Sequence, residues 1–139
     1  MPELAYDEIK VGDEASLSRT VTEAHIVAYA GITGDVNPVH TDAEYAKKSM
    51  FGERIAHGML MAGFISAVLG TQLPGENSIY LGQELKFTAP VKIGDTVTVT
   101  VTVTEKRDDK RIIKLQTTVS NQRGETVVDG SAVAKKAGL

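Results

Sequence analysis

Residues 57–69 read HGMLMAGFISAVL and are apolar almost all the way round a helix. This pattern is typical of a helix enclosed on every side, because a helix with one face in solvent keeps polar residues on that face. The wider apolar run, residues 55–70, includes a histidine and a serine and is shorter than the roughly 18 residues of a transmembrane helix. We therefore predict a buried central helix that other parts of the chain must wrap.

The last part of the chain supplies the predicted wrapper. Four segments have the residue pattern of strands and are separated by short turn sequences: residues 79–87, 96–105, 111–120 and 126–135. The second begins TVTVTVTVT, so its valines point to one face of a sheet and its threonines to the other. Short turns favour an antiparallel meander. A sheet around a helix is an α+β fold, and we expect one domain over residues 1–139.

A strand and a helix are predicted before the central helix. The alternation over residues 15–21 indicates a short half-buried strand. The T-x-x-E spacing of Thr20 and Glu23 is that of a capping box, with Thr22 as the alternative cap. The helix that follows is expected to end between residues 31 and 34, where glycines occur.

A polar sequence and a second short helix come next. Residues 34–40 read GDVNPVH, which we interpret as a loop. The sequence TDAE at residues 41–44 has the spacing of another capping box, and we expect a short helix from there through Lys47 and Lys48.

The composition excludes several kinds of site. The chain has no cysteine, which rules out a disulfide framework, a thiolate metal site and a cysteine nucleophile. Its net charge is −3 and its basic residues form no cluster, so we expect neither a nucleic-acid partner nor a membrane. The N-terminal sequence MPELAYDEIK is acidic and lacks the apolar core of a secretory signal, which favours a cytoplasmic location.

The chemistry of the chain is expected in the polar loop. Asp35 and His40 lie five residues apart on either side of Pro38, which fixes its own φ and favours an extended Asn37. A carboxylate and an imidazole at one spot are suited to acid and base catalysis on a water molecule. The structural alternative is an Asx turn at Asp35 and an ordinary loop histidine. Asn37 is expected to order the loop through hydrogen bonds to the backbone.

A resemblance to a known family starts in this loop. The stretch YAGITGDVNPVH, residues 29–40, resembles the signature of MaoC-like (R)-specific enoyl-CoA hydratases, a G-D-x-N-P-x-H core after an aromatic and small residues. Residues 54–66, RIAHGMLMAGFIS, and 78–97, SIYLGQELKFTAPVKIGDTV, resemble the start of the family's central helix and its second strand. The resemblance implies a hot-dog fold, similar to that of polyhydroxyalkanoate (PHA)-linked hydratases, with residues 31–52 overhanging the sheet as the catalytic segment.

The resemblance also assigns roles to individual residues. Asp35 and His40 are the expected catalytic pair, and Gly58 is the expected oxyanion-hole residue. A helix N-terminus presents unpaired N–H groups to a thioester oxygen, and a glycine there allows close approach; packing is the alternative reason for this glycine. Three further residues are expected to shape the acyl pocket, with ordinary core packing as the alternative: Ser66, Leu69 and Val133.

The remaining histidines receive no catalytic role. His57 is flanked by apolar residues at a helix start, which is typical of a satisfied structural histidine, and His25 is expected on the solvent side of its helix. The three histidines are widely separated and contain no His-x-x-x-His pair, so we expect no metal site. Two interpretations of Lys47 and Lys48 stay open and explain the pair equally well: contact with the phosphates of coenzyme A, or a solvated helix end.

The implied activity is that of a hydro-lyase of fatty acid metabolism. It adds water reversibly to trans-2-enoyl-CoA to give (R)-3-hydroxyacyl-CoA, with coenzyme A as part of the substrate and no other cofactor. Hot-dog subunits usually pair their sheets, so a homodimer with active sites at or near the interface is expected. Three alternatives stay open: a dehydratase of acyl carrier protein thioesters, a hot-dog acyl-CoA thioesterase, and a non-catalytic subunit that binds acyl thioesters.

Overall fold

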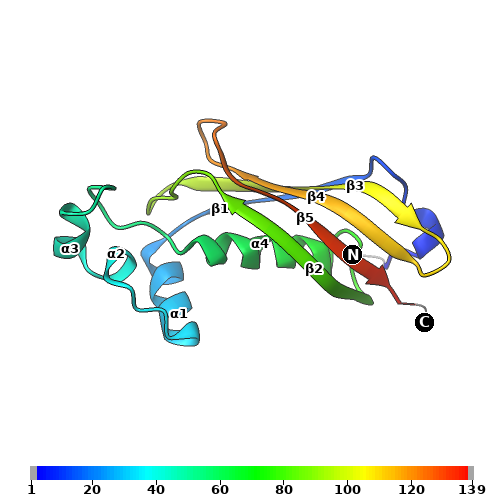
Figure 1. Ribbon diagram of the computed structural model, residues 1–139, viewed down its shortest axis with the longest axis horizontal. Helices are drawn as coiled ribbons and strands as arrows, with labels where there is room; N and C mark the ends of the chain where they lie inside the picture. The colour runs from blue at the N-terminus through cyan, green and yellow to red at the C-terminus, as the bar shows by residue number, and fades with distance from the viewer. Residues whose placement is uncertain (1–2, 138–139) are drawn as a thin grey trace.

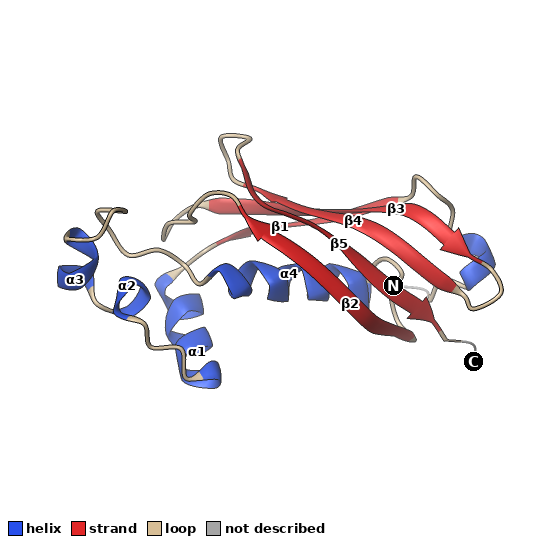
Figure 2. Ribbon diagram, in the orientation of Figure 1, coloured by secondary structure: helices blue, strands red, loops and turns tan. Residues whose placement is uncertain are grey.

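The structure, a computed structural model, describes residues 3–137 as one antiparallel sheet lying across a central helix (Figures 1 and 2). The sheet contains five strands: β1 (Glu14–Thr20), β2 (Ser78–Phe87), β3 (Thr96–Arg107), β4 (Ile112–Ser120) and β5 (Thr126–Lys136). The helical segments are the 3-10 helix η1 (Tyr6–Glu8), α1 (Glu23–Thr33), α2 (Pro38–Thr41), α3 (Ala43–Lys47) and the central α4 (Gly58–Thr71).

Alternation along β3 builds the inner face of the sheet. Four valines are at most 1 % exposed, while the threonines between them are half-buried: Val97, Val99, Val101 and Val103. They share one apolar core with Ile65 and Val68 of α4. Full burial of each such side chain contributes roughly 1.5–3 kcal/mol. The prediction that the valines face the helix is therefore confirmed.

The pairing of β2 corrects the predicted four-strand meander. Strands β3, β4 and β5 follow one another, but β2 crosses to the far edge and pairs with β5, while β1 pairs with the free side of β3. The close approach of β2 to β5 depends on Gly130 of β5, since a Cβ there would lie 1.9 Å from the backbone oxygen of Glu84 in β2. The short connection between β2 and β3 suggested that these two strands pair, but β4 and β5 lie between them in the sheet.

The central helix is covered on one side only within this chain. Met61, Ile65 and Val68 are buried against the sheet. The opposite face is exposed and mostly carries small residues: Met59, Gly63, Ser66, Ala67 and Gly70. The expectation that the chain encloses the helix on every side is therefore wrong. An apolar pattern shows that a face avoids water, but it does not show which chain covers that face.

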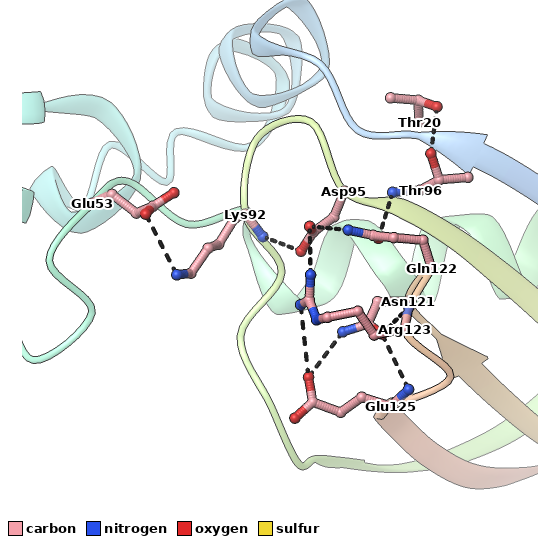
Figure 3. Close-up of polar contacts among 9 residues, drawn as sticks. All are labelled: Thr20, Glu53, Lys92, Asp95, Thr96, Asn121, Gln122, Arg123 and Glu125. Atoms are coloured by element: carbon pink, nitrogen blue, oxygen red, sulfur yellow. Dashed lines mark hydrogen bonds and ion pairs between the residues drawn. The ribbon is translucent and has the colours of Figure 1, made fainter.

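The carboxylate of Asp95 ties two turns together at one end of the sheet (Figure 3). Asp95 is 5 % exposed and accepts hydrogen bonds from the backbone N–H of Lys92 at 3.0 Å and the side chain of Gln122 at 2.9 Å. Arg123 lies 3.7 Å from the same carboxylate. Burial alone would raise the pKa of Asp95, but these hydrogen bonds and nearby positive charges outweigh it and lower that pKa below its usual value.

The segment with α1, α2 and α3 projects beyond the sheet at one end of α4 (Figures 1 and 2). Thr22 is the N-cap of α1, because Thr20 belongs to β1 and bonds to Thr96 instead. Asp42 caps α3 by accepting from the backbone N–H groups of two residues of that helix. The overhang is thus ordered by its own caps. Within residues 3–137, no helix is both long enough and apolar enough to cross a membrane.

Candidate active site

The end of α1 sets the position of Asp35. The helix stops at Gly34, whose φ of 81° lies in the left-handed region that favours glycine. The N–H of Asp35 then donates to Oγ1 of Thr33 at 3.1 Å, and Oδ1 of Asp35 accepts from the N–H of Asn37 at 3.3 Å. Asp35 therefore forms an Asx turn, but it stays exposed and accessible to a water molecule.

The next residues form the one-turn helix α2, so the prediction of a loop throughout residues 34–40 is wrong from Pro38 onward. Pro38 occupies the first helical position, where its missing N–H costs no hydrogen bond. The side-chain oxygen of Asn37 caps this turn by accepting from the N–H of Val39 at 3.2 Å. This turn carries His40 back toward the start of α4.

Backbone contacts fix both the ring and the main chain of His40, which is 9 % exposed. Its Nδ1 lies 2.8 Å from the backbone oxygen of Ile55. A carbonyl oxygen only accepts, so Nδ1 carries the hydrogen and Nε2 keeps a lone pair that can take a proton. The backbone oxygen of His40 accepts from Nε of Arg54 at 2.7 Å, and Arg54 pairs with Glu23 at 2.7 Å.

His57 also lies in the site, which corrects its interpretation as a satisfied structural histidine. The ring is 1 % exposed and stacks on the ring of His40, with centroids 4.0 Å apart. Its Nε2 lies 2.9 Å from the backbone oxygen of Asp35, whereas Nδ1 is buried with no hydrogen-bond partner among residues 3–137. The two histidines are distant in sequence but meet because the N–H of Ile55 donates to the oxygen of Val39 at 3.3 Å.

The cluster has donor atoms of the kind that bind metals. Atoms of Asp35, His40 and His57 lie within 4.8 Å of one another. However, the two imidazole rings are stacked with only 29° between their planes, so their in-plane lone pairs do not converge on one ion at about 2.0–2.1 Å. The arrangement fits proton transfer better than tetrahedral coordination.

These three residues form the polar wall of a cavity of about 480 Å³. Its other walls are mainly apolar and include Gly58 and Phe87. Gly58 is the first residue of α4, where backbone N–H groups lack intrahelical partners and the helix end carries partial positive charge. A Cβ on Gly58 would lie 2.8 Å from two ring atoms of Phe87. The cavity therefore joins an acid–base pair to a site suited to a carbonyl oxygen.

Known proteins share this sequence and architecture. Residues 7–124 match the family model described as MaoC like domain. The chain belongs to the MaoC-like family. It is 51 % identical over 127 residues to the (R)-specific enoyl-CoA hydratase of Rhodospirillum rubrum, and the match covers 91 % of this chain and 88 % of that protein.

Two solved structures extend the MaoC-like assignment to the fold. The unliganded R-hydratase PhaJ1 of Pseudomonas aeruginosa has a TM-score of 0.92 and 46 % identity, covering 96 % of this chain and 86 % of that one. The (R)-hydratase of Aeromonas caviae involved in PHA biosynthesis has a TM-score of 0.90 and 45 % identity, covering 93 % and 98 %. The predicted hot-dog fold is thereby confirmed.

The three residues predicted to shape the acyl pocket lie apart in this MaoC-like chain. Ser66 lines a second cavity of about 540 Å³ between α4 and β2. Leu69 is 3 % exposed in the hydrophobic core. Val133 lies on the outer face of β5, because the alternate residues Ala132 and Ala134 point into the core. One chain thus does not bring the three together, and their contact with substrate stays a prediction.

Local contacts show the surroundings of two further residues considered in the sequence, Lys47 and His25. Lys47 pairs with Glu44 at 2.9 Å and both side chains are exposed, as expected for a solvated helix end. His25 is half-buried rather than on the solvent side, because its Nδ1 accepts from the N–H of Thr22 at 3.1 Å and its ring meets the ring of Phe64 edge-on.

Sequence reasoning missed three residues of the site: Arg54, His57 and Phe87. The position of His57 directly before Gly58 was the one available signal, and it was outweighed by the apolar surroundings. Arg54 donates a hydrogen bond to the backbone oxygen of His40, and the ring of Phe87 fills the space that a Cβ on Gly58 would occupy. Neither kind of contact leaves a spacing pattern in one sequence.

Proposed function

We propose that this chain catalyses the reversible (R)-specific hydration of trans-2-enoyl-CoA to (R)-3-hydroxyacyl-CoA. Hydratase relatives at 45 to 51 % identity over nearly the whole chain support this activity. The observation that carries the proposal is the meeting of the Asp35 carboxylate with the His40 ring in one cavity beside the N-terminus of α4. Coenzyme A enters as part of the substrate, and the proposed chemistry needs no metal or redox cofactor.

In the proposed reaction, Asp35 and His40 hold one water molecule. Its oxygen attacks C3 as it gives a proton to this pair, and the electrons of the C2–C3 double bond move toward the thioester oxygen. The N–H of Gly58 stabilises the charge that develops there. The electrons then return to C2, which takes a proton from the same pair. Since one water supplies both groups on one face, the addition is syn and nothing else is consumed.

We propose that the acyl chain extends from this site along the exposed face of α4 toward Ser66. Met59 and Phe87 line both the active-site cavity and the second cavity, which supports a continuous path. The second cavity is mainly apolar, as an acyl chain requires. Leu69 lies in the core beneath this face, so any influence of Leu69 on the acyl chain would come from there.

The proposed working unit is a homodimer in the cytoplasm. Exposed apolar side chains gather on α4 and on the edge strand β2: Met59, Ile79, Tyr80, Leu81 and Phe87. A sheet edge of this kind has unpaired backbone groups that a second strand can bond. A second copy here would cover the open face of α4 and enclose the acyl path. We also propose a role in PHA metabolism, because the similar (R)-hydratase of Aeromonas caviae is involved in PHA biosynthesis.

Crotonyl-CoA tests the activity directly. Loss of enoyl absorbance without release of free thiol is expected, whereas thiol release without hydration would indicate a thioesterase. Asp35→Asn and His40→Ala should each lower turnover by roughly 100- to 10,000-fold, the usual range for acid–base groups, and leave a folded dimer by gel filtration. His25→Asn is the control because His25 lies outside the cavity. Turnover near the wild-type value in either variant would refute the role of that residue.

Crotonyl-acyl carrier protein tests the carrier. Comparison of its kcat/KM with that of crotonyl-CoA separates the proposed hydratase from a carrier-protein dehydratase, which would use the same Asp35 and His40. A binding subunit without activity would give no absorbance change with either substrate.

A further inference from the structure

His57 touches both members of the proposed acid–base pair and lies, almost fully buried, in the wall of the active-site cavity. Its Nε2 reaches the backbone oxygen of Asp35 at 2.9 Å, and its ring stacks on His40 at 4.0 Å. Tyr29 lies against the ring as well, with centroids 4.5 Å apart. The ring of His57 therefore contacts two aromatic neighbours while its Nε2 contacts the Asp35 turn.

The hydrogen-bond partners determine which nitrogen of His57 carries a hydrogen. The backbone oxygen of Asp35 can only accept, so Nε2 is the protonated nitrogen and the buried Nδ1 has a bare lone pair. His40 has the opposite tautomer, with Nδ1 donating to Ile55. The two stacked rings thus have different tautomers, each fixed by one carbonyl oxygen.

A purely local structural role does not account for this arrangement. His57 occupies the N-cap of α4, where a short polar side chain normally accepts a backbone N–H of the first turn. The side chain of His57 makes no such capping bond. It leaves Nδ1 buried and unpaired, which is unfavourable, and contacts the two residues of the acid–base pair instead.

We propose that His57 is a positioning residue for hydration: its Nε2–H holds the Asp35 turn and its ring fixes the plane of the His40 ring. The inference rests on the proposed hydratase function and adds a residue that acts through Asp35 and His40. Its contribution is to keep the carboxylate and Nε2 of His40 aimed at one water molecule. Small errors in such alignment are costly in rate and leave substrate binding nearly unchanged.

Two substitutions separate the hydrogen bond from general stability. The side-chain amide of His57→Gln reaches about as far as Nε2 does, whereas that of His57→Asn stops near the position of Nδ1. We expect His57→Asn to lower kcat for crotonyl-CoA by roughly 10- to 100-fold with KM within about threefold, and His57→Gln to recover part of that loss. Equal kcat values for His57→Asn and wild type, or equal losses in both variants, would overturn the proposal.

A double-mutant cycle tests whether His57 acts through His40. In a His40→Ala background, the further loss from His57→Asn should be clearly smaller than in wild type, because the ring that it positions is gone and only the Asp35 turn is left for it to hold. An undiminished loss in that background would mean that His57 contributes independently, and would overturn the proposal. Thermal unfolding of each variant excludes a loss of folded protein as the cause of a lower kcat.

The wild-type protein provides a test that needs no variant. In ¹⁵N NMR spectra of the ring nitrogens, His57 should have Nε2 protonated and Nδ1 bare, and His40 the reverse. A hydrogen on Nδ1 of His57 with a bare Nε2 would overturn the proposal even if His57→Asn failed to fold. Failure of wild type to hydrate crotonyl-CoA would instead refute the proposed function, since the tautomers are measured without substrate.

Discussion

Replacement of Gly58 by alanine is expected to lower catalysis more than stability. The new Cβ would lie 2.8 Å from Cδ1 and Cε1 of Phe87, whereas carbon atoms in contact prefer about 3.5–4.0 Å, so the ring must retreat by roughly 1 Å. Phe87 ends β2 and is 53 % exposed, which lets the ring turn toward solvent. The expected cost is at most about 1–3 kcal/mol of unfolding free energy.

The catalytic effect of Gly58→Ala comes from crowding at the N-terminus of α4. The methyl group and the displaced ring both occupy the wall where the thioester oxygen is proposed to bind. Loss of one oxyanion-hole donor lowers kcat by about 100- to 1,000-fold, so partial disturbance should lower it at least about tenfold. The assay is kcat on crotonyl-CoA together with thermal unfolding.

The matched control is Gly70→Ala on the same helix, where an added Cβ meets nothing within 4 Å. It should retain wild-type kcat. A folded Gly58→Ala protein with wild-type kcat would refute the carbonyl-binding role of this position, and equal losses in both variants would assign the effect to the helix as a whole.

Three more outcomes are expected. EDTA should not inhibit, because the stacked histidines do not converge on an ion; inhibition reversed by added Zn²⁺ would contradict this. Leu69→Ala should destabilise the fold by roughly 2–5 kcal/mol as a buried core substitution, while a raised ratio of kcat/KM for octenoyl-CoA over crotonyl-CoA would show that Leu69 also limits the acyl pocket. The lowered pKa of Asp95 stabilises the fold above the unfolded-state pKa of about 3.9, and this contribution is lost as pH falls through the lower folded-state pKa. In acid unfolding, Asp95→Asn should therefore reduce stability near neutral pH and flatten its decline on acidification; an unchanged pH profile would contradict the assignment.

Strand positions followed from the sequence because burial there depends on local alternation. The valines of β3 show this, since each occupies the face that the pattern assigns. Pairing partners did not follow, because β2 joins β5 through a close approach at Gly130 that involves residues far apart in the chain. The exposed face of α4 was also mispredicted, because an apolar pattern does not show whether the same chain covers that face.

The acid–base pair was proposed because Asp35 and His40 sit in one short signature. His57 escaped for the opposite reason, since it reaches the site only after residues 41–56 fold back. The one-turn helix α2 was missed because a four-residue helix has no periodicity to detect. Local sequence thus indicated the proposed acid–base pair, and long-range contacts brought His57 to it.

The pairing of β1 with β3 has a consequence for how the protein is made. Glu14 and Thr102 bond across 88 residues of chain, and the segment that bears Asp35 and His40 lies inside this loop. On the ribosome, β1 therefore emerges long before β3, the strand with which it pairs. Contacts of such long separation slow folding. Asp35 and His40 are thus synthesised early, whereas the strand pairing that closes the loop around them forms only after β3 has left the exit tunnel.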